Sequence, residues 1–479
     1  MIVKDIFKKK SVEEFNKLEK DNHFNRTLNL FQIISLGVGI VIGAGIFILT
    51  GLAAGYHAGP AVTLSFALAG LVCVCAGLCY AEFASMIYVS GSAYSYTYIS
   101  FGRLPAFVIG IITILGYFFG ATTAIAGWSG YLVDLLGDFN IYLPEYLLHP
   151  PGHIISYKNV QMKSILDLPS LIFTLTATFL MLYKVEYSAR FTSFLVFLKL
   201  AVLIIFVVIG FFHIDITNLK PYIPDNTGQY GNFGYSGIVA GATVVFLSFN
   251  GFDAVCTAAQ ETKNPRSDIP RGILITIAVV TIIYISVAFV LTGIINYDDL
   301  SVPYAFSIAL SKINIPWFSF LIKIGAIAGL SSVIIVSIFT VVRMLVAIGN
   351  DYALARHFFV INQSTKTPKK LTMMVGILMA ITASIANIHL IIKISSFFIL
   401  LSLLVVCSGT LFLHYNSLNL NRSFKCPYMP FTPLVAILLI IYMLTHYTWA
   451  IHLIIFITLL SIICLYFFIR FISIKDYNN

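Results

Sequence analysis

The sequence predicts an all-α polytopic membrane protein with twelve transmembrane helices. Of its 479 residues, 59% are hydrophobic and 10% are charged, whereas soluble domains have about 45–50% apolar and about 25% charged residues. The apolar residues form twelve long segments, each of a length that can cross the hydrocarbon core as a helix. These segments are uninterrupted runs and lack the alternation typical of outer-membrane strands. The composition therefore excludes a soluble globular protein, a disordered chain, a secreted disulfide scaffold and an outer-membrane barrel.

The expected spans are connected by short polar stretches. In chain order they cover 28–52, 60–88, 104–136, 166–183, 190–212, 234–258, 270–295, 316–342, 371–388, 393–414, 429–447 and 449–472. Several exceed the ~20 residues needed to cross the membrane, so tilted or broken helices are expected.

The charged residues outside the spans predict the orientation of the chain. Segment 1–27 is polar and has no apolar region typical of a removable signal peptide. If it is cytoplasmic, 22 Lys and Arg residues fall on the inner side and five on the outer side, with two left inside spans. Cytoplasmic loops are rich in Lys and Arg. Both termini are therefore expected in the cytoplasm, and the net charge of +9 needs no nucleic-acid partner.

Proline positions indicate that the chain contains an internal repeat. Pro60 and Pro270, which open the second and seventh spans, are 210 residues apart. Pro105 and Pro316, which open the third and eighth, are 211 residues apart. Membrane helices often begin with proline by chance, so this spacing alone does not distinguish a repeat from a coincidence.

A third pair of positions follows the same spacing. The Gly-Ala-Gly stretch at 43–45 and the Asn-Gly pair at 250–251 are separated by about the same number of residues. Because each repeat would hold five spans, the second copy must enter the membrane from the opposite face. The pattern predicts inverted repeats at 28–212 and 234–414, an arrangement found in many secondary transporters. Residues 415–479 would add helices 11 and 12 and a cytoplasmic C-terminus.

The first span carries a candidate helix break. Its central residues are Ile42, Gly43, Ala44 and Gly45. Glycines at this spacing also serve close helix packing. If the helix unwinds here, backbone N–H groups at the start of its second half favour a carboxylate. Irregular backbone at this depth is tolerated only where it lines a cavity.

The sixth span carries the matching candidate, because Asn-Gly followed by a carboxylate is unusual in a lipid-facing helix. Unwinding here frees carbonyl groups, which suit an ammonium group. The break would fall at Asn250 and Gly251. A donor-rich break facing an acceptor-rich break forms a site for a zwitterion, which predicts an amino acid as ligand.

Several motifs resemble those of the amino acid–polyamine–organocation superfamily, and within it the cationic amino acid transporter branch. The motifs are IGAGIF (42–47), AGPAVTLSF (58–66), GLCYAEFASM (77–86), GSAYSY (91–96), GFDAV (251–255), ETKNPRSDIPRGI (261–273) and GAIAGLSS (325–332). The resemblance implies a five-plus-five inverted-repeat fold with broken helices 1 and 6 and two extra helices. It also implies substrate contacts at Ile42, Gly43, Ala44 and Gly45 and along the segment 246–251. The candidate binding residues of that segment are Phe246, Ser248, Phe249, Asn250 and Gly251. One departure is the stretch 111–117, where family members often carry a polar or acidic residue. This sequence has no carboxylate there, which weakens the case for a cationic side chain as substrate.

Two ionisable residues within the spans are candidates for the mechanism. Lys199 lies nine residues past Arg190, about 14 Å along a helix and thus near the midplane. Burial disfavours the charged ammonium, so its proton can exchange. The resemblance places Lys199 where sodium binds in sodium-coupled members of this fold. It implies a proton-coupling role, with contacts to the first break and to Ser331 and Ser332. The alternative is a structural lysine that caps carbonyls.

The acidic residues of the spans are expected to support the site. Asp253 follows the second break and has three open roles: holding a proton, interacting with substrate, or capping freed backbone. Glu82, near the end of 60–88, is expected to pair with a loop amide or an arginine.

The sequence thus predicts a secondary active transporter of amino acids, with proton-coupled uptake by alternating access. An amino acid exchanger without proton coupling is the alternative. An intramembrane enzyme is disfavoured, because such sites need clustered acids and histidines. We expect no cofactor. We also expect no metal site, since Pro150 and Pro151 break any helix that would align His149 with His153. The expected partners are substrate, proton and lipids in a plasma or bacterial inner membrane, while the oligomeric state stays open.

Overall fold

The computed structural model describes most of the chain. The described residues are 7–11, 14, 28–43, 45–87, 91–151, 154–157, 160–182, 185–302, 305–313, 315–352, 368–416 and 422–478. Statements below refer to these residues.

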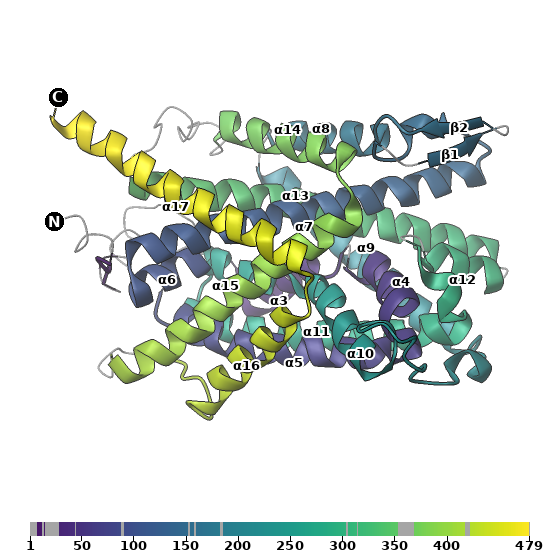
Figure 1. Cartoon of the computed structure of the whole chain (residues 1–479), viewed down its shortest axis with the longest axis horizontal. Coiled ribbons are helices and arrows are strands. Elements are labelled where there is room, and N and C mark those ends of the chain that lie inside the picture. Colours follow the sequence, from purple (N-terminus) through teal and green to yellow (C-terminus); the bar gives the residue numbers. More distant parts are fainter. Residues whose placement is uncertain are drawn as a thin grey trace.

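Long helices running side by side dominate the architecture (Figure 1). The longest are α7 (Arg103–Asp138), α9 (Val185–Phe211), α11 (Pro265–Ile294), α13 (Pro316–Tyr352), α15 (Ile388–Asn416) and α17 (Trp449–Asn478). The remaining α-helices are α3 (Leu30–Val41), α4 (Thr50–Ala53), α5 (Val62–Ala84), α6 (Ala93–Phe101), α8 (Leu168–Met181), α10 (Gly234–Val245), α12 (Ala305–Ile313), α14 (Lys369–Ile385) and α16 (Phe431–Thr445).

Short turns of other helix types connect these elements. Two are π-helical, Gly45–Leu49 and Ala54–Ala58. Six are 3-10 helices: Gly59–Ala61, Glu145–Leu147, Ile216–Leu219, Phe246–Phe249, Phe252–Glu261 and Tyr297–Leu300.

Within the described residues, eight helical stretches are long and apolar enough to cross a membrane. The expectation was twelve spans, and the difference has two sources. The first two expected spans fall in one apolar stretch, Leu30–Ala84, which counts as a single candidate span. Three others correspond to helices of fewer than 18 residues, namely α8 with 14, α14 with 17 and α16 with 15.

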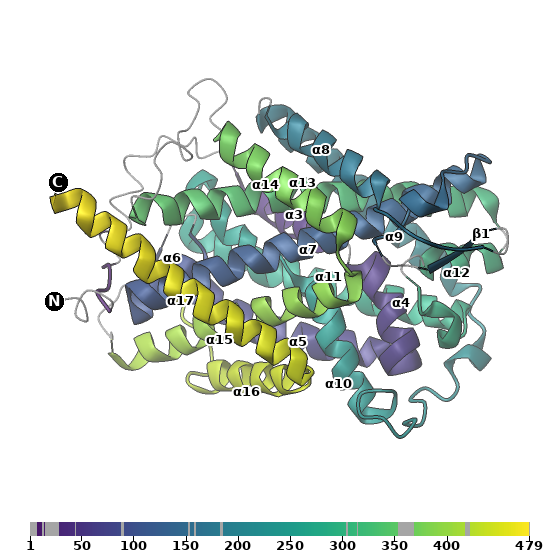
Figure 2. The same cartoon turned by 45° about the horizontal axis from the view of Figure 1, so that its top comes forward.

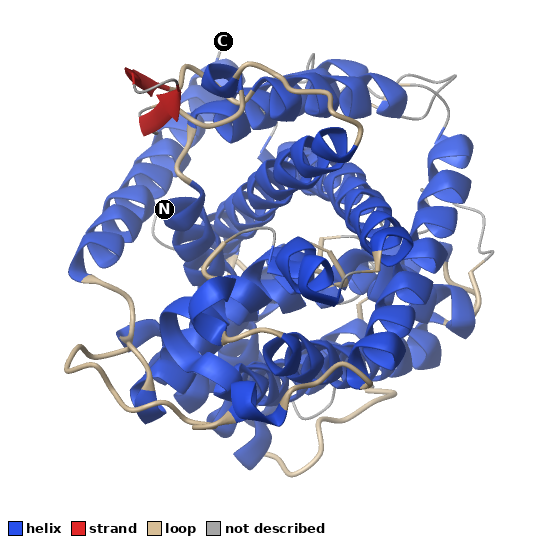
Figure 3. Ribbon diagram, turned by 90° about the vertical axis from the view of Figure 1, so that its right-hand side faces the viewer, coloured by secondary structure: helices blue, strands red, loops and turns tan. Residues whose placement is uncertain are grey.

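The expected all-α class needs one correction, because the stretch between α7 and α8 contains a small antiparallel hairpin. Strand β1 (Ile154–Tyr157) pairs with β2 (Val160–Lys163), and Ile154 lies opposite Lys163. The strands include Ile, Val and Tyr residues, which favour β-structure. Figure 3 shows the hairpin at the periphery of the bundle, away from its core.

The centre of the bundle is formed by helices from distant parts of the sequence. Helix α7 packs against α13 and α15, and α11 packs against α5 and α3. Helices α8 and α14 lie side by side along one flank (Figure 2). The buried residues of the described chain form one continuous apolar core.

Helix α17 presents large apolar side chains to its surroundings. Phe456, Ile457 and Phe468 are each more than half exposed. Contiguous exposed apolar surface on this scale is typical of a membrane or protein interface. Together with the long apolar helices, it supports an integral membrane protein.

Glu82 of α5 is fixed in a buried ion pair, which confirms the expectation of an arginine or loop-amide partner. Its carboxylate accepts hydrogen bonds from the Arg422 guanidinium at 2.7 Å and from the Cys426 backbone N–H at 2.9 Å. Arg422 also donates to the Leu413 carbonyl at 2.9 Å. The two charged side chains are 2% and 6% exposed, so this pair ties α5 to the segment between α15 and α16.

Replacing one member of this pair is expected to destabilise the protein strongly. Glu82→Gln leaves the Arg422 charge buried without its counter-ion, which costs about 3–5 kcal/mol. The melting temperature of detergent-purified protein should therefore fall. The double variant Glu82→Gln with Arg422→Met should recover part of the loss. The same change at exposed Glu145, Glu145→Gln, is the control, and an equal melting temperature for Glu82→Gln and this control would contradict the prediction.

Candidate functional site

The first helical run is interrupted at the expected place. Helix α3 ends at Val41, and Ile42 has an extended backbone with φ −73° and ψ 106°. Helical structure resumes at Gly45. Ile42 and Gly43 are buried but not helical, and Ala44 lies outside the described residues. A buried non-helical backbone must find hydrogen-bond partners outside its own helix.

The second interruption lies between α10 and the 3-10 helix Phe252–Glu261. Asn250 has an extended backbone with φ −59° and ψ 131°. Gly251 has φ +112°, in the region that favours glycine. A Cβ at Gly251 would also lie 2.3 Å from Ile40 Cγ2. Glycine is therefore required twice over, by backbone conformation and by the close approach of α3.

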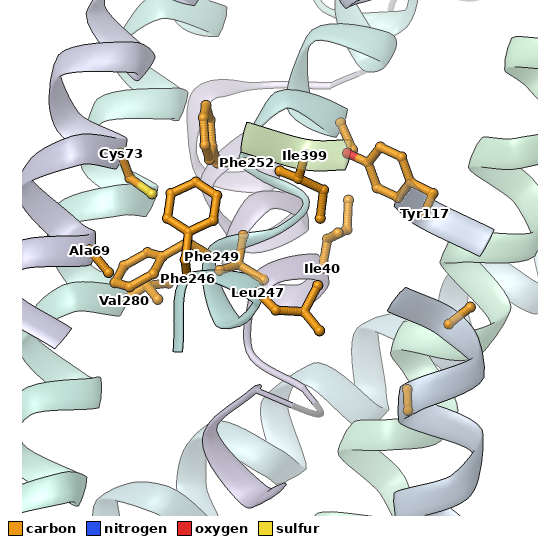
Figure 4. Packing of buried hydrophobic residues seen from close by; sticks show 14 of the residues in the cluster. Ile40, Ala69, Cys73, Tyr117, Phe246, Leu247, Phe249, Phe252, Val280 and Ile399 are labelled. Atoms are coloured by element: carbon orange, nitrogen blue, oxygen red, sulfur yellow. The ribbon is translucent and has the colours of Figure 1, made fainter. Parts of the chain in front are cut away.

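The two interruptions are in direct contact. A Cβ at Gly45 would lie 2.2 Å from the Ser248 Cα, so the two segments touch here. A Cβ at Gly43 would lie 2.2 Å from Val333 Cγ2, so the first break also packs closely against α13. Figure 4 shows the side chains of Phe246, Leu247, Phe249 and Ile40 lying near one another in the buried core. The predicted residues Ile42, Gly43, Gly45, Phe246, Ser248, Phe249, Asn250 and Gly251 thus belong to two neighbouring breaks.

Tyr284 of α11 links the two breaks. Its hydroxyl lies 2.8 Å from the Val41 carbonyl and 2.9 Å from the Ser248 carbonyl. Tyr131 of α7 donates to the Phe47 carbonyl at 2.9 Å. Sequence reasoning missed both tyrosines, because neither belongs to a motif that marks it as a partner of the breaks.

Lys199 of α9 points into the first break. Its ammonium group donates to the carbonyls of Gly39 and Ile42 and, at 3.0 Å, to the Ser332 hydroxyl. The side chain is completely buried. No acidic side chain pairs with it in the part of the chain that the structure describes. This geometry is compatible with both roles considered for Lys199, carbonyl capping and proton exchange.

The two serines of α13 have different partners. Ser332 contacts Lys199, whereas Ser331 accepts a hydrogen bond from the Trp128 indole at 2.9 Å and donates to the Ile327 carbonyl at 2.7 Å. Ser331 was expected beside Lys199. The two residues are successive on a helix and so point in different directions, which leaves only Ser332 as a direct partner.

Two polar atoms at the second break have no hydrogen-bond partner among the residues that the structure describes. They are the Ser248 hydroxyl and the side-chain carbonyl of Asn250, and both atoms are buried. Gly120 of α7 makes room for Asn250, since a Cβ there would lie 3.1 Å from its amide nitrogen. Buried polar atoms without partners are rare. These two are therefore the atoms best placed to bind a ligand.

Asp253 is buried beside the second break and faces hydroxyl groups. It accepts a hydrogen bond from Tyr117 at 2.6 Å and a long one from Ser92 at 3.5 Å. Tyr117 is the last residue of the stretch 111–117, in which the sequence has no carboxylate. No cation forms an ion pair with Asp253 among the described residues. Within the same residues, no cluster of His, Cys, Asp and Glu side chains suited to a metal ion occurs.

This arrangement, an apolar helical bundle with two broken helices that meet in its core, defines a membrane transport protein. The profile of the amino acid permease family matches residues 28–469. The chain belongs to this family, which agrees with the resemblance seen in its motifs.

Individual relatives cover nearly the whole chain. It is 34% identical to the methylthioribose transporter of Bacillus subtilis over 93% of its length and 94% of that protein. It is 32% identical to the branched-chain amino acid permease BcaP of the same organism, over 93% of both chains. It is also 32% identical to cationic amino acid transporter 7 of Arabidopsis thaliana, over 81% of this chain and 66% of that protein. These relatives are permeases and transporters rather than enzymes.

Proposed function

We propose that this protein takes up a neutral amino acid together with a proton, by alternating access. The observation that carries the proposal is the contact between the two helix breaks, with unpaired polar atoms at Ser248 and Asn250. The start of a half-helix attracts a carboxylate. The second break supplies acceptors for an ammonium group.

The chemistry around the breaks favours a neutral substrate side chain. Ile40, Phe246, Leu247 and Phe249 are buried there. The nearby acid, Asp253, is occupied by the Tyr117 hydroxyl. A cationic side chain would need a free carboxylate in the same space, because burying an unpaired charge is costly. The similarity to a branched-chain amino acid permease supports the same substrate class.

We further propose that the twelve expected segments all cross a plasma or bacterial inner membrane, with both termini in the cytoplasm. In this topology 28–212 and 234–414 form the inverted repeats, and helices in 415–479 lie outside them. Rocking one group of helices against the other would then expose the breaks to each side in turn. Lys199 is the proposed proton carrier, with Ser332 as its partner. Asp253 supports the second break, and Ser331 supports the packing of α13 against Trp128 of α7.

Ligand screening and uptake assays test this function. The melting temperature of detergent-purified protein is measured with each of the twenty amino acids and with methylthioribose. Stabilising amino acids are then tested for uptake into liposomes under an inward proton gradient. We expect stabilisation by branched-chain amino acids and accumulation that collapses when a protonophore removes the gradient.

Other outcomes would identify other functions. Uptake driven only by amino acid on the opposite side, with no effect of the proton gradient, would favour an exchanger. Stabilisation by methylthioribose and by no amino acid would overturn the proposed substrate class.

A further inference from the structure

The described part of the chain contains a cavity beside α10 and α15. It has a volume of about 250 Å³ and is lined by α10, α15, the segment 446–448 after α16, the stretch 230–232 and His57. None of the predicted binding residues lines it. Drug-sized ligands occupy about 300–1,000 Å³, so this cavity suits a smaller molecule. In the proposed topology it lies on the outer side, since α15 begins and α16 ends there.

The positive charge of this cavity is that of Lys393, and its other basic side chains are two histidines. Lys393, His57 and His446 line it, and its described lining contains no acidic residue. The His57 ring nitrogen Nδ1 lies 2.8 Å from the Gly231 carbonyl, and His446 Nε2 lies 2.5 Å from the Tyr230 hydroxyl. Both rings are thereby held in place. The cavity therefore favours a negatively charged ligand.

Two hydroxyl groups of the cavity wall make no well-formed hydrogen bond within the described residues. They belong to Ser396 and Tyr447, which neighbour each other, and both oxygen atoms are buried. The Ser396 side chain is 1% exposed. Leaving a buried hydroxyl without a hydrogen bond costs about 1–3 kcal/mol. A ligand that accepts hydrogen bonds from these groups would recover that cost.

We propose that this cavity is a second ligand site, which binds the carboxylate of an amino acid before it reaches the breaks. Lys393 supplies the positive charge, and Ser396 and Tyr447 donate hydrogen bonds to the carboxylate oxygens. Hydrogen bonds to an ionised group are stronger than neutral ones. The statement that the ligand is the transported amino acid rests on the proposed function. The statement that the cavity binds a carboxylate does not.

The binding test uses isovalerate, which has the carbon skeleton and carboxylate of valine, a branched-chain amino acid, but no ammonium group. Its affinity for the detergent-purified full chain is measured by titration calorimetry. We expect binding that weakens about tenfold in Lys393→Gln and in Ser396→Ala, since each removes an interaction with a charged group. Exposed Lys312 provides the matched control, and Lys312→Gln should bind isovalerate as the unaltered protein does. If Lys393→Gln does not fold, Ser396→Ala and Tyr447→Phe carry the same test.

Three results would overturn the proposal. They are the absence of isovalerate binding, equal binding by the Lys393→Gln and Lys312→Gln variants, and full displacement of isovalerate by phosphatidylglycerol in nanodiscs. For the last result, nanodiscs of pure phosphatidylcholine are the control and should retain isovalerate. Displacement by phosphatidylglycerol alone would assign the cavity to an anionic lipid headgroup.

Leucine uptake separates this proposal from the proposed function. Lys393→Gln should raise the KM for leucine and leave kcat unchanged, because the carboxylate is held only before transport. If isovalerate binds as expected but leucine is not taken up by the unaltered protein, the proposed function fails and the carboxylate site remains.

Discussion

Replacing Lys199 with methionine is expected to abolish amino acid accumulation driven by a proton gradient. Methionine has a similar length but cannot carry a proton. In the proposed mechanism, the ammonium form bonds the carbonyls of Gly39 and Ile42 and the Ser332 hydroxyl. Loss of the proton weakens these bonds and so loosens the first break. The measurement is uptake into liposomes at a fixed inside pH and a series of outside pH values.

The same variant separates proton coupling from simple capping of carbonyls. A coupling lysine is needed for gradient-driven accumulation but not for exchange of substrate across the membrane. Lys199→Met should therefore retain exchange, with a rate independent of pH. Because the two carbonyls lose their donor, the variant should also be less stable by about 1–3 kcal/mol for each unpaired group. Equal loss of uptake and exchange would show that Lys199 is only a structural cap.

A second substitution and a second lysine sharpen this test. Arginine stays protonated in proteins, so Lys199→Arg should keep a positive charge at the break and still lose the dependence of uptake on pH. Lys323 is the matched control, since it is 4% exposed but pairs with Asp134 at 3.0 Å and Asp138 at 2.7 Å. Lys323→Met should keep gradient-driven uptake. If Lys199→Met also keeps it, the coupling role is wrong.

The sequence predicted those parts of the site that depend on local chemistry. Glycine beside a small residue in mid-span predicted the first break, and Asn-Gly before Asp253 predicted the second. The depth of Lys199 in its helix followed from residue spacing alone. Each of these features is determined by a few consecutive residues, so no knowledge of the tertiary fold was needed.

The partners of these residues depend on tertiary packing and were harder to predict. Tyr284 joins the breaks from α11, where no motif sets it apart from the other polar residues of that helix. The hydrogen bond from Tyr117 to Asp253 joins two segments that are far apart in the sequence. The difference between Ser331 and Ser332 depends on the rotation of α13 about its axis, which sequence spacing does not fix. The β1–β2 hairpin was missed because its strands are only four residues each.

Replacing Gly45 with alanine is expected to separate the two breaks and to remove amino acid binding. The new Cβ would lie 2.2 Å from the Ser248 Cα and 2.3 Å from its Cβ, closer than atoms can pack. Because one of these neighbours is backbone, a side-chain rotation cannot relieve the clash. Overpacking of a rigid core costs about 1–3 kcal/mol or more. Here the strain falls on the segment that holds the unpaired Ser248 hydroxyl.

Gly130 of α7 offers a matched control for this substitution, because a Cβ there meets nothing within 4 Å. Gly130→Ala should preserve uptake and stabilise the helix by about 0.5–1 kcal/mol, since alanine loses less backbone entropy than glycine. Stabilisation of each variant by leucine in detergent reports binding without requiring transport. We expect it to vanish in Gly45→Ala and to persist in Gly130→Ala. If Gly45→Ala still binds leucine as tightly as Gly130→Ala does, the ligand does not occupy the contact between the breaks, and the location of the substrate site proposed here is wrong.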